Sequence, residues 1–126
     1  MYYSEKDILR ASVIPVLLGS SDEAFQISWK IYFRSGILSY VCDERRSFSQ
    51  MLNPCARFFE LGARSEPDIL LESLAYFASE RDYLPIIIPC NEFYLDFTKR
   101  YRDALESKFI ISNPKRFFEE KPMSIF

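Results

Sequence analysis

The chain has 126 residues, the size of a single domain, with 48% hydrophobic residues and a formal net charge of −2. Its 16 basic and 18 acidic residues are nearly balanced, which disfavours general electrostatic binding to nucleic acid. The sequence has no run of about 18 apolar residues for a membrane span, and its first residues lack the basic and apolar segments of a signal peptide. We therefore expect a cytoplasmic protein with no nucleic-acid or membrane partner.

The cysteine and histidine content limits the available chemistry. Cys42, Cys55 and Cys90 are widely spaced, and the chain contains neither a CxxC pair nor a histidine. A disulfide framework and a zinc site are therefore not expected. Without histidine, the Ser-His-Asp and Cys-His arrangements of nucleophilic catalysis cannot be assembled from this chain alone.

The first predicted element is a strand over residues 13–18, which is apolar on both faces, as a strand between two layers must be. Gly19 allows a sharp turn after this strand. Ser20 and Glu23 have the spacing of a capping box, which predicts that a helix begins there and runs over residues 21–35.

This predicted helix has one apolar face at helical spacing and an aromatic stripe beside it. The apolar face consists of Ala24, Ile27, Ser28 and Ile31. We interpret the stripe of Phe25, Trp29 and Tyr32 as core packing too, because large apolar side chains at helical spacing are most often buried. Gly36 stands where a C′ glycine ends a helix.

A second apolar strand is predicted over residues 37–42, and Asp43 follows it. In a dinucleotide-binding fold, an acidic residue at this place binds the ribose. That interpretation is not favoured here, because the turn at Gly19 has a single glycine instead of the G-x-G-x-x-G loop that binds the pyrophosphate. We therefore interpret Asp43 as a solvated strand end.

The rest of the chain continues the alternation of strands and helices after an irregular polar segment, 45–54, with one helical turn. The predicted elements are an edge strand at 56–61, a helix from Ser65 to about 81–83, a central strand at 84–89, a helix from Glu92 to about Ser107, a strand at 109–112 and a last helix at 115–120. This order predicts an α/β fold: a three-layer Rossmann-like domain with a mainly parallel sheet of about five strands and helices on both faces.

Two turns at the carboxyl ends of predicted strands are the candidate binding sites. They comprise Gly19, Ser20 and Ser21 after the first strand, and Cys90, Asn91 and Glu92 after the fourth. In a parallel sheet, both turns lie at the same edge and precede helix N-termini, whose N–H groups can bind a carboxylate or phosphate. We interpret Cys90 as a buried small residue and not as a nucleophile, because the chain has no histidine to act as its base.

The order of these segments resembles a known family. Residues 14–19, 36–41, 87–94 and 109–112 look like the corresponding parts of bacterial ATP-grasp carboxylate–amine ligases. The resemblance extends over residues 12–118 and implies that the chain 1–126 is a single pre-ATP-grasp domain, the Rossmann-like N-terminal module of such a ligase. It carries over as substrate-binding residues Gly19, Ser20 and Ser21, and more weakly Cys90, Asn91 and Glu92, with no catalytic residue and no metal ligand in this chain.

In ligases of this family, ATP and Mg²⁺ bind mainly in later domains, where a carboxylate is converted to an acyl phosphate that an amine then attacks. The resemblance therefore implies a domain that holds a carboxylate or amine substrate beside the ATP-grasp domains of the same polypeptide. Those domains are expected beyond residue 126, and this domain alone is expected to be inactive and without a cofactor. The turn Gly-Ser-Ser-Asp departs from relatives, which often have a second glycine and an earlier Asp.

Two alternatives stay open at this point. The first is a free-standing Rossmann-like module that binds a nucleotide or a small anion and has a regulatory role. The second is an interaction domain whose exposed aromatic side chains dock on a partner, since 17% of the residues are aromatic. A homodimer is among the assemblies that such a surface would allow.

Overall fold

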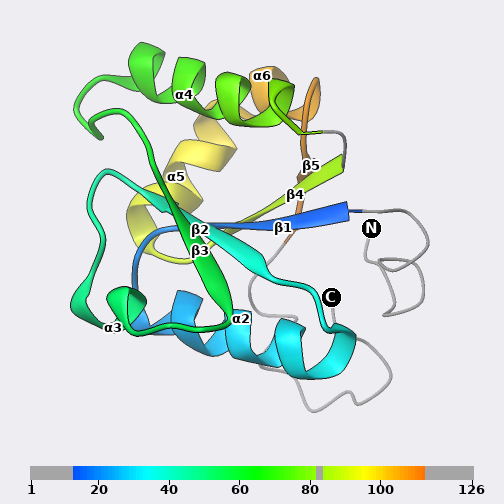
Figure 1. Ribbon diagram of the computed structural model, residues 1–126. Helices are drawn as coiled ribbons and strands as arrows, with labels where there is room; N and C mark the ends of the chain where they lie inside the picture. Colours follow the sequence, from blue (N-terminus) through cyan, green and yellow to red (C-terminus); the bar gives the residue numbers. More distant parts are fainter. Residues whose placement is uncertain (1–12, 82–83, 113–126) are drawn as a thin grey trace.

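A computed structural model of the chain describes residues 13–81 and 84–112. These residues form a five-stranded sheet in which every neighbouring pair is parallel, with the strand order β3-β2-β1-β4-β5 (Figure 1). The strands are β1 Val13–Leu18, β2 Ser39–Asp43, β3 Ala56–Glu60, β4 Leu84–Pro89 and β5 Ile110–Ile111. The predicted fold class is confirmed, and so is the edge position of the strand at 56–61. The strand at 84–89 has a neighbour on each side, but β1 is the middle strand.

Helices cover both faces of the sheet. They are α2 Asp22–Ser35, α3 Phe48–Met51, α4 Pro67–Ser79, α5 Glu92–Arg100 and α6 Arg102–Glu106. Figure 1 shows α2 and α3 on one side of the sheet and α4, α5 and α6 on the other. The last predicted helix, at 115–120, lies outside the described residues. None of the helices in the described ranges is long and apolar enough to cross a membrane.

Successive residues of β1 enter different cores, because side chains of a strand alternate between the two faces of a sheet. Leu17 packs with Ile27 and Ile31 of α2, whereas Val16 and Leu18 pack in the larger core against α4, α5 and α6. The side chains of both cores are at most 9% exposed, which explains why β1 and β4 are continuous apolar runs in the sequence.

The ends of α2 differ in part from the prediction. Ser21, and not Ser20, is the N-cap, because its Oγ accepts a hydrogen bond from the N–H of Ala24 at 3.2 Å. The capping box expected between Ser20 and Glu23 is therefore wrong by one residue. Gly36 ends the helix as predicted, with a left-handed φ of 74°.

The aromatic stripe of α2 is only partly buried. The predicted core face is confirmed, but the stripe beside it opens toward solvent. Phe25 and Trp29 are half-buried, whereas Tyr32 is 38% exposed and the next residue, Phe33, is 68% exposed. The interpretation of the whole stripe as core packing is therefore wrong at Tyr32.

Three later boundaries also differ from the sequence prediction. The second strand begins at Ser39, two residues later than predicted. Helix α4 begins at Pro67 with Glu66 as a cap that makes no side-chain hydrogen bond, so the predicted capping serine, Ser65, does not act as one. The single helix predicted from Glu92 to Ser107 is divided at Tyr101, where the backbone leaves the helical conformation (φ −110°, ψ 28°) and separates α5 from α6.

Candidate functional site

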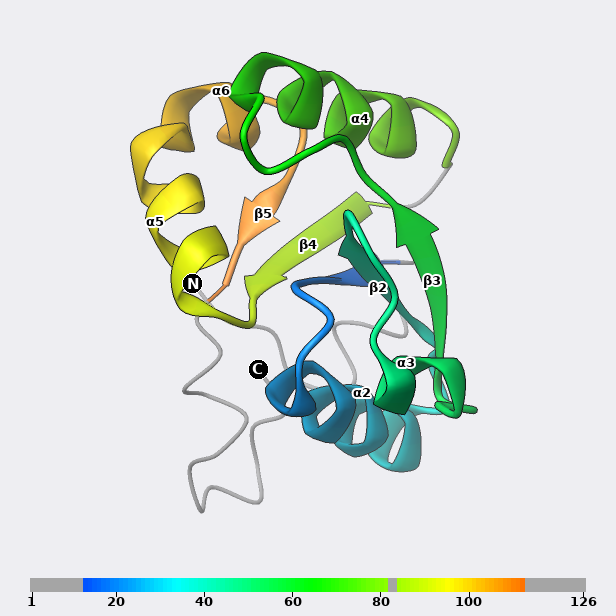
Figure 2. The ribbon, with the colours of Figure 1, turned by 90° about the vertical axis from the view of Figure 1, so that its left-hand side faces the viewer.

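The sheet has a topological switch point between β1 and β4. The chain runs from β1 outward through β2 to β3, and then returns to the other side of β1 to form β4 and β5. In open α/β sheets, ligands bind in the crevice at the carboxyl ends of the two strands that flank such a point. Figure 2 views the molecule from the end at which β1 leads into α2 and β4 leads into α5.

The structure brings the two predicted turns into contact at this switch point. The N–H of Cys90 donates a hydrogen bond to the carbonyl of Leu18 at 2.8 Å, which extends the β1–β4 ladder by one residue. The Oγ of Ser21 donates to the carbonyl of Cys90 at 3.0 Å. We use the name switch-point crevice for the surface formed by residues 19–22 and 90–93, where the general rule for open α/β sheets would place a ligand.

The side chains of the two turns are largely engaged within the fold. Asn91 Oδ1 accepts from the N–H of Tyr94 at 2.9 Å and so caps α5, in the same way that Ser21 caps α2. Ser20 Oγ accepts from the N–H of Ser47 at 2.7 Å. The Cys90 thiol is 2% exposed and donates to the carbonyl of Ile88 at 3.3 Å. Among the six predicted site residues, Glu92 alone is exposed; the other five are buried or half-buried.

Gly19 makes the contact between the turns possible. Its φ is 115°, a conformation that favours glycine. A Cβ at this position would lie 2.7 Å from Nδ2 of Asn91. The glycine therefore allows one turn to pack on the other. The Asn91 side chain fills the space next to Gly19 that a ligand would need.

Asp43 is buried at the end of β2, so its interpretation as a solvated strand end is wrong. Its side chain is about 5% exposed, and Oδ2 accepts from the N–H of Ser20 at 2.8 Å. Oδ1 accepts from the Tyr94 hydroxyl at 2.9 Å and from the N–H of Glu44 at 2.7 Å. Because these donors and Arg64 enclose the carboxylate, it is not available to bind a ribose. This burial disfavours a dinucleotide site, as does the single glycine in the turn at Gly19.

Arg64 is the residue of this site that the sequence analysis missed. It lies four residues beyond the end of β3, and its Nη2 donates to both carboxylate oxygens of Asp43, at 2.9 and 3.1 Å. Its guanidinium also lies over the rings of Phe93 and Tyr94, with Cζ 5.2 Å from each ring centroid. The side chain is 36% exposed, and Nη1 makes no hydrogen bond to the described residues.

The electrostatics of this cluster favour the charged form of Arg64 and the neutral form of Tyr94. Burial lowers the pKa of Arg64, but the hydrogen bond and the charge of Asp43 outweigh it and raise the pKa overall. Burial, together with the charge and hydrogen bond of Asp43, raises the pKa of the Tyr94 phenol well above its ordinary value. Tyr94 therefore stays a neutral donor, and Arg64 is a fixed cation at the rim of the crevice.

Acidic side chains lie around the same crevice. Asp22, Glu23 and Glu92 are in the first turns of α2 and α5, where a negative charge stabilises the helix N-terminus. Burial raises the pKa of Glu23. No group of three or more His, Cys, Asp or Glu side chains in the described residues is arranged to hold a metal ion. This edge of the sheet therefore combines a fixed arginine with two helix N-termini and three acidic side chains.

Comparison with known proteins identifies no relative of this chain: no family model matches it, and no curated protein matches it in sequence.

The buried thiols give a testable property of this edge of the sheet. Cys42 and Cys90 are at most 2% exposed, and burial raises the pKa of both thiols. Because only the thiolate reacts, we expect both to be alkylated by iodoacetamide at pH 8 about 100-fold more slowly in the native protein than in denaturant. Mass spectrometry after a timed pulse measures this. Similar rates in the two conditions would contradict the burial of these thiols.

Proposed function

We propose that this chain is the N-terminal domain of an ATP-grasp ligase that joins a carboxylate to an amine, and that the switch-point crevice forms one wall of its substrate cleft. Three features support the proposal: the family resemblance of the sequence, the Rossmann-like parallel sheet, and the contact between the turns after β1 and β4. The domain contributes binding and orientation, while ATP and Mg²⁺ bind mainly in the ATP-grasp domains of the same polypeptide.

The observation that carries substrate binding in this proposal is the anchored Arg64 at the rim of the crevice. Its Nε and Nη2 edge is held by Asp43, and its face lies on two aromatic rings, so the guanidinium has little freedom left. The remaining Nη1 donors are suited to a carboxylate oxygen of a substrate. The first two N–H groups of α2 and of α5 supply further donors, whereas the N–H groups of Ala24 and Tyr94 are bound to the helix caps.

The acidic side chains of the crevice support a role on the amine side as well. Asp22 and Glu92 are exposed acidic residues at the two helix starts. A substrate that carries both a carboxylate and an ammonium group would pair its carboxylate with Arg64 and its ammonium group with these acids. We therefore propose an amino acid or a similar zwitterion as the ligand of this wall.

The test uses the native full-length polypeptide and measures ADP release from ATP and Mg²⁺ when a mixture of the proteinogenic amino acids is added. We expect Arg64→Gln to raise the KM for the amino acid by about 10-fold or more, because a charge-assisted hydrogen bond contributes about 1.5–3 kcal/mol. Arg64→Lys retains a positive charge that can pair with Asp43, so the protein should stay folded. Lysine lacks the Nη1 donors that would face the substrate, so the KM for the amino acid should still rise. Circular dichroism checks folding.

Arg100→Gln is the matched control, because Arg100 pairs with Asp96 on the exposed face of α5. Unchanged KM in both Arg64 variants would contradict the role of Arg64. If the wild-type polypeptide releases no ADP and the chain instead binds inorganic phosphate saturably in the crevice, the alternative of a free-standing anion-binding module is favoured.

A further inference from the structure

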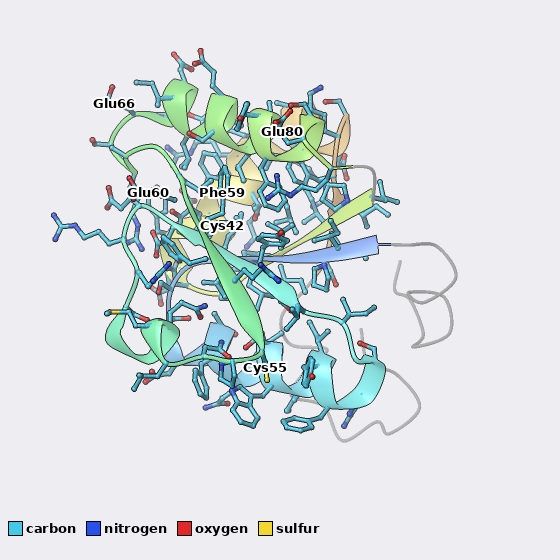
Figure 3. The ribbon with its side chains drawn as sticks, in the orientation of Figure 1. Cys42, Cys55, Phe59, Glu60, Glu66 and Glu80 are labelled. Atoms are coloured by element: carbon cyan, nitrogen blue, oxygen red, sulfur yellow. The ribbon has the colours of Figure 1, made fainter. Side chains whose placement is uncertain are left out.

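A hollow lies at the outer edge of β3, two strands away from β1. Its volume is about 460 Å³, and its walls include Arg46, Arg57 and Arg81 together with the rings of Tyr40, Phe58 and Phe59. Figure 3 shows β3 crossing in front of the sheet, with Phe59 on the side of the strand that faces α4. The volume is within the range of small-molecule sites, about 300–1,000 Å³.

Arginine is the only charged residue type among the described side chains that line this hollow. The chain as a whole has more acidic than basic residues, 18 against 16, but no carboxylate side chain is among the described residues that line this hollow with the three arginines. None of the three forms an ion pair with a described residue. Arg46 and Arg57 are exposed and Arg81 is half-buried, so their donors are open to a ligand from solvent.

Two of these guanidinium groups are held in place by aromatic rings. Arg46 Cζ lies 5.1 Å from the centroid of Phe58, and Arg81 Cζ lies 4.0 Å from Phe77 and 4.8 Å from Tyr40. A guanidinium that lies over a ring keeps its N–H donors at its edge, where they can bind an anion. One donor of Arg81 is used, since Nη1 donates to the carbonyl of Phe77 at 3.3 Å.

The open edge of β3 adds backbone donors. Ser39 donates from its N–H to the carbonyl of Cys55, and Leu61 donates from its N–H to the carbonyl of Asp43, so β3 bonds to β2 through its odd-numbered residues. In a parallel ladder, the residues between them point their N–H and C=O groups to the other side. The N–H of Phe58 therefore faces away from β2, toward the hollow.

We propose that this hollow binds a polyanionic small molecule with two or more phosphate or carboxylate groups. The arginines are spread along both faces of β3, because Phe58 and Phe59 point to opposite faces and each has a guanidinium over its ring. A single anionic group would contact the cations of one face, whereas two linked groups can contact the cations of both faces. The site is separate from the switch-point crevice and does not depend on the proposed ligase function.

Isothermal titration of the chain with pyrophosphate and, separately, with citrate tests this proposal at low ionic strength. We expect saturable binding of at least one of them, and the pair of titrations distinguishes a phosphate ligand from a carboxylate ligand. Arg46→Gln and Arg57→Gln should each weaken it by about 10-fold, because each removes a charge-assisted contact. Arg81→Lys keeps the charge but loses the planar donor edge and should weaken binding without unfolding the protein.

Arg45→Gln and Arg100→Gln are the controls. Arg45 is exposed and next in sequence to Arg46 but does not line the hollow, and Arg100 pairs with Asp96 on the exposed face of α5. Neither change should alter the affinity. An equal loss in either control, or no saturable binding of either anion, would overturn the proposal. Binding of an acidic extended peptide without either small anion would overturn it in favour of strand addition at β3.

Discussion

Replacing Asp43 by alanine is expected to lower the free energy of unfolding by about 3 kcal/mol, the lower end of the range for breaking a buried ion pair. The change leaves the Tyr94 hydroxyl and the N–H of Ser20 without their acceptor and removes the anion that holds Arg64. We take the lower end because the Arg64 side chain is 36% exposed and can regain water. Since a domain of this size is stable by only about 5–15 kcal/mol, this is a large fraction of its stability.

Urea denaturation followed by circular dichroism measures this effect. Glu44→Ala is the matched control, because Glu44 is adjacent, carries the same charge and has a 3.8 Å contact with Arg64, but is 37% exposed. It should cost less than about 1 kcal/mol. Asp43→Asn retains the shape and one acceptor oxygen and should fall between the two. If Asp43→Ala costs no more than Glu44→Ala, the cluster does not stabilise this end of the sheet.

Replacing Gly19 by alanine is expected to cost about 2–4 kcal/mol, the sum of backbone strain at a φ of 115° and a displaced helix cap. The new methyl group would lie 2.7 Å from Nδ2 of Asn91. Asn91 cannot move away freely, because its Oδ1 caps α5 through the N–H of Tyr94. The steric conflict therefore reaches the start of the next helix.

Two comparisons separate the strain from the steric conflict. Gly36→Ala places a Cβ at a φ of 74° where nothing lies within 4 Å, so it should show backbone strain alone, about 1–2 kcal/mol. In a background with Asn91→Ala, the additional cost of Gly19→Ala should fall, because the clashing amide is gone. If Gly19→Ala lowers the free energy of unfolding equally in the wild type and in Asn91→Ala, the two turns do not pack on each other as described.

The sequence predicted those parts of the fold that depend on a few neighbouring residues. The apolar runs of β1 and β4 identify strands covered on both faces, and Pro67, Gly36 and Asn91 mark helix ends through backbone preferences that act within one turn. Alternation of these elements then leaves few topologies other than a parallel three-layer sheet. This is why the fold class is confirmed while several boundaries moved by one or two residues.

The Asp43–Arg64 pair could not be predicted in the same way. Asp43 ends β2 whereas Arg64 lies in the loop after β3, so their contact depends on the register of β2 against β3 and on the path of residues 61–63. The neighbouring contacts also explain the misplaced cap of α2: Ser20 Oγ accepts from the N–H of Ser47, so Ser21 supplies the oxygen that caps the helix. A polar residue just beyond the end of an edge strand was the available signal, and it is a weak one.

The size of the native gene product tests the central claim most directly. An antibody against this chain, used on an immunoblot of extract from the source cells, measures it. If the chain is the N-terminal domain of an ATP-grasp ligase, the band must lie far above the 14.9 kDa of the chain itself, because the ATP-grasp domains belong to the same polypeptide. A single band at 14.9 kDa would contradict the ligase proposal and leave the free-standing binding module as the account of this fold.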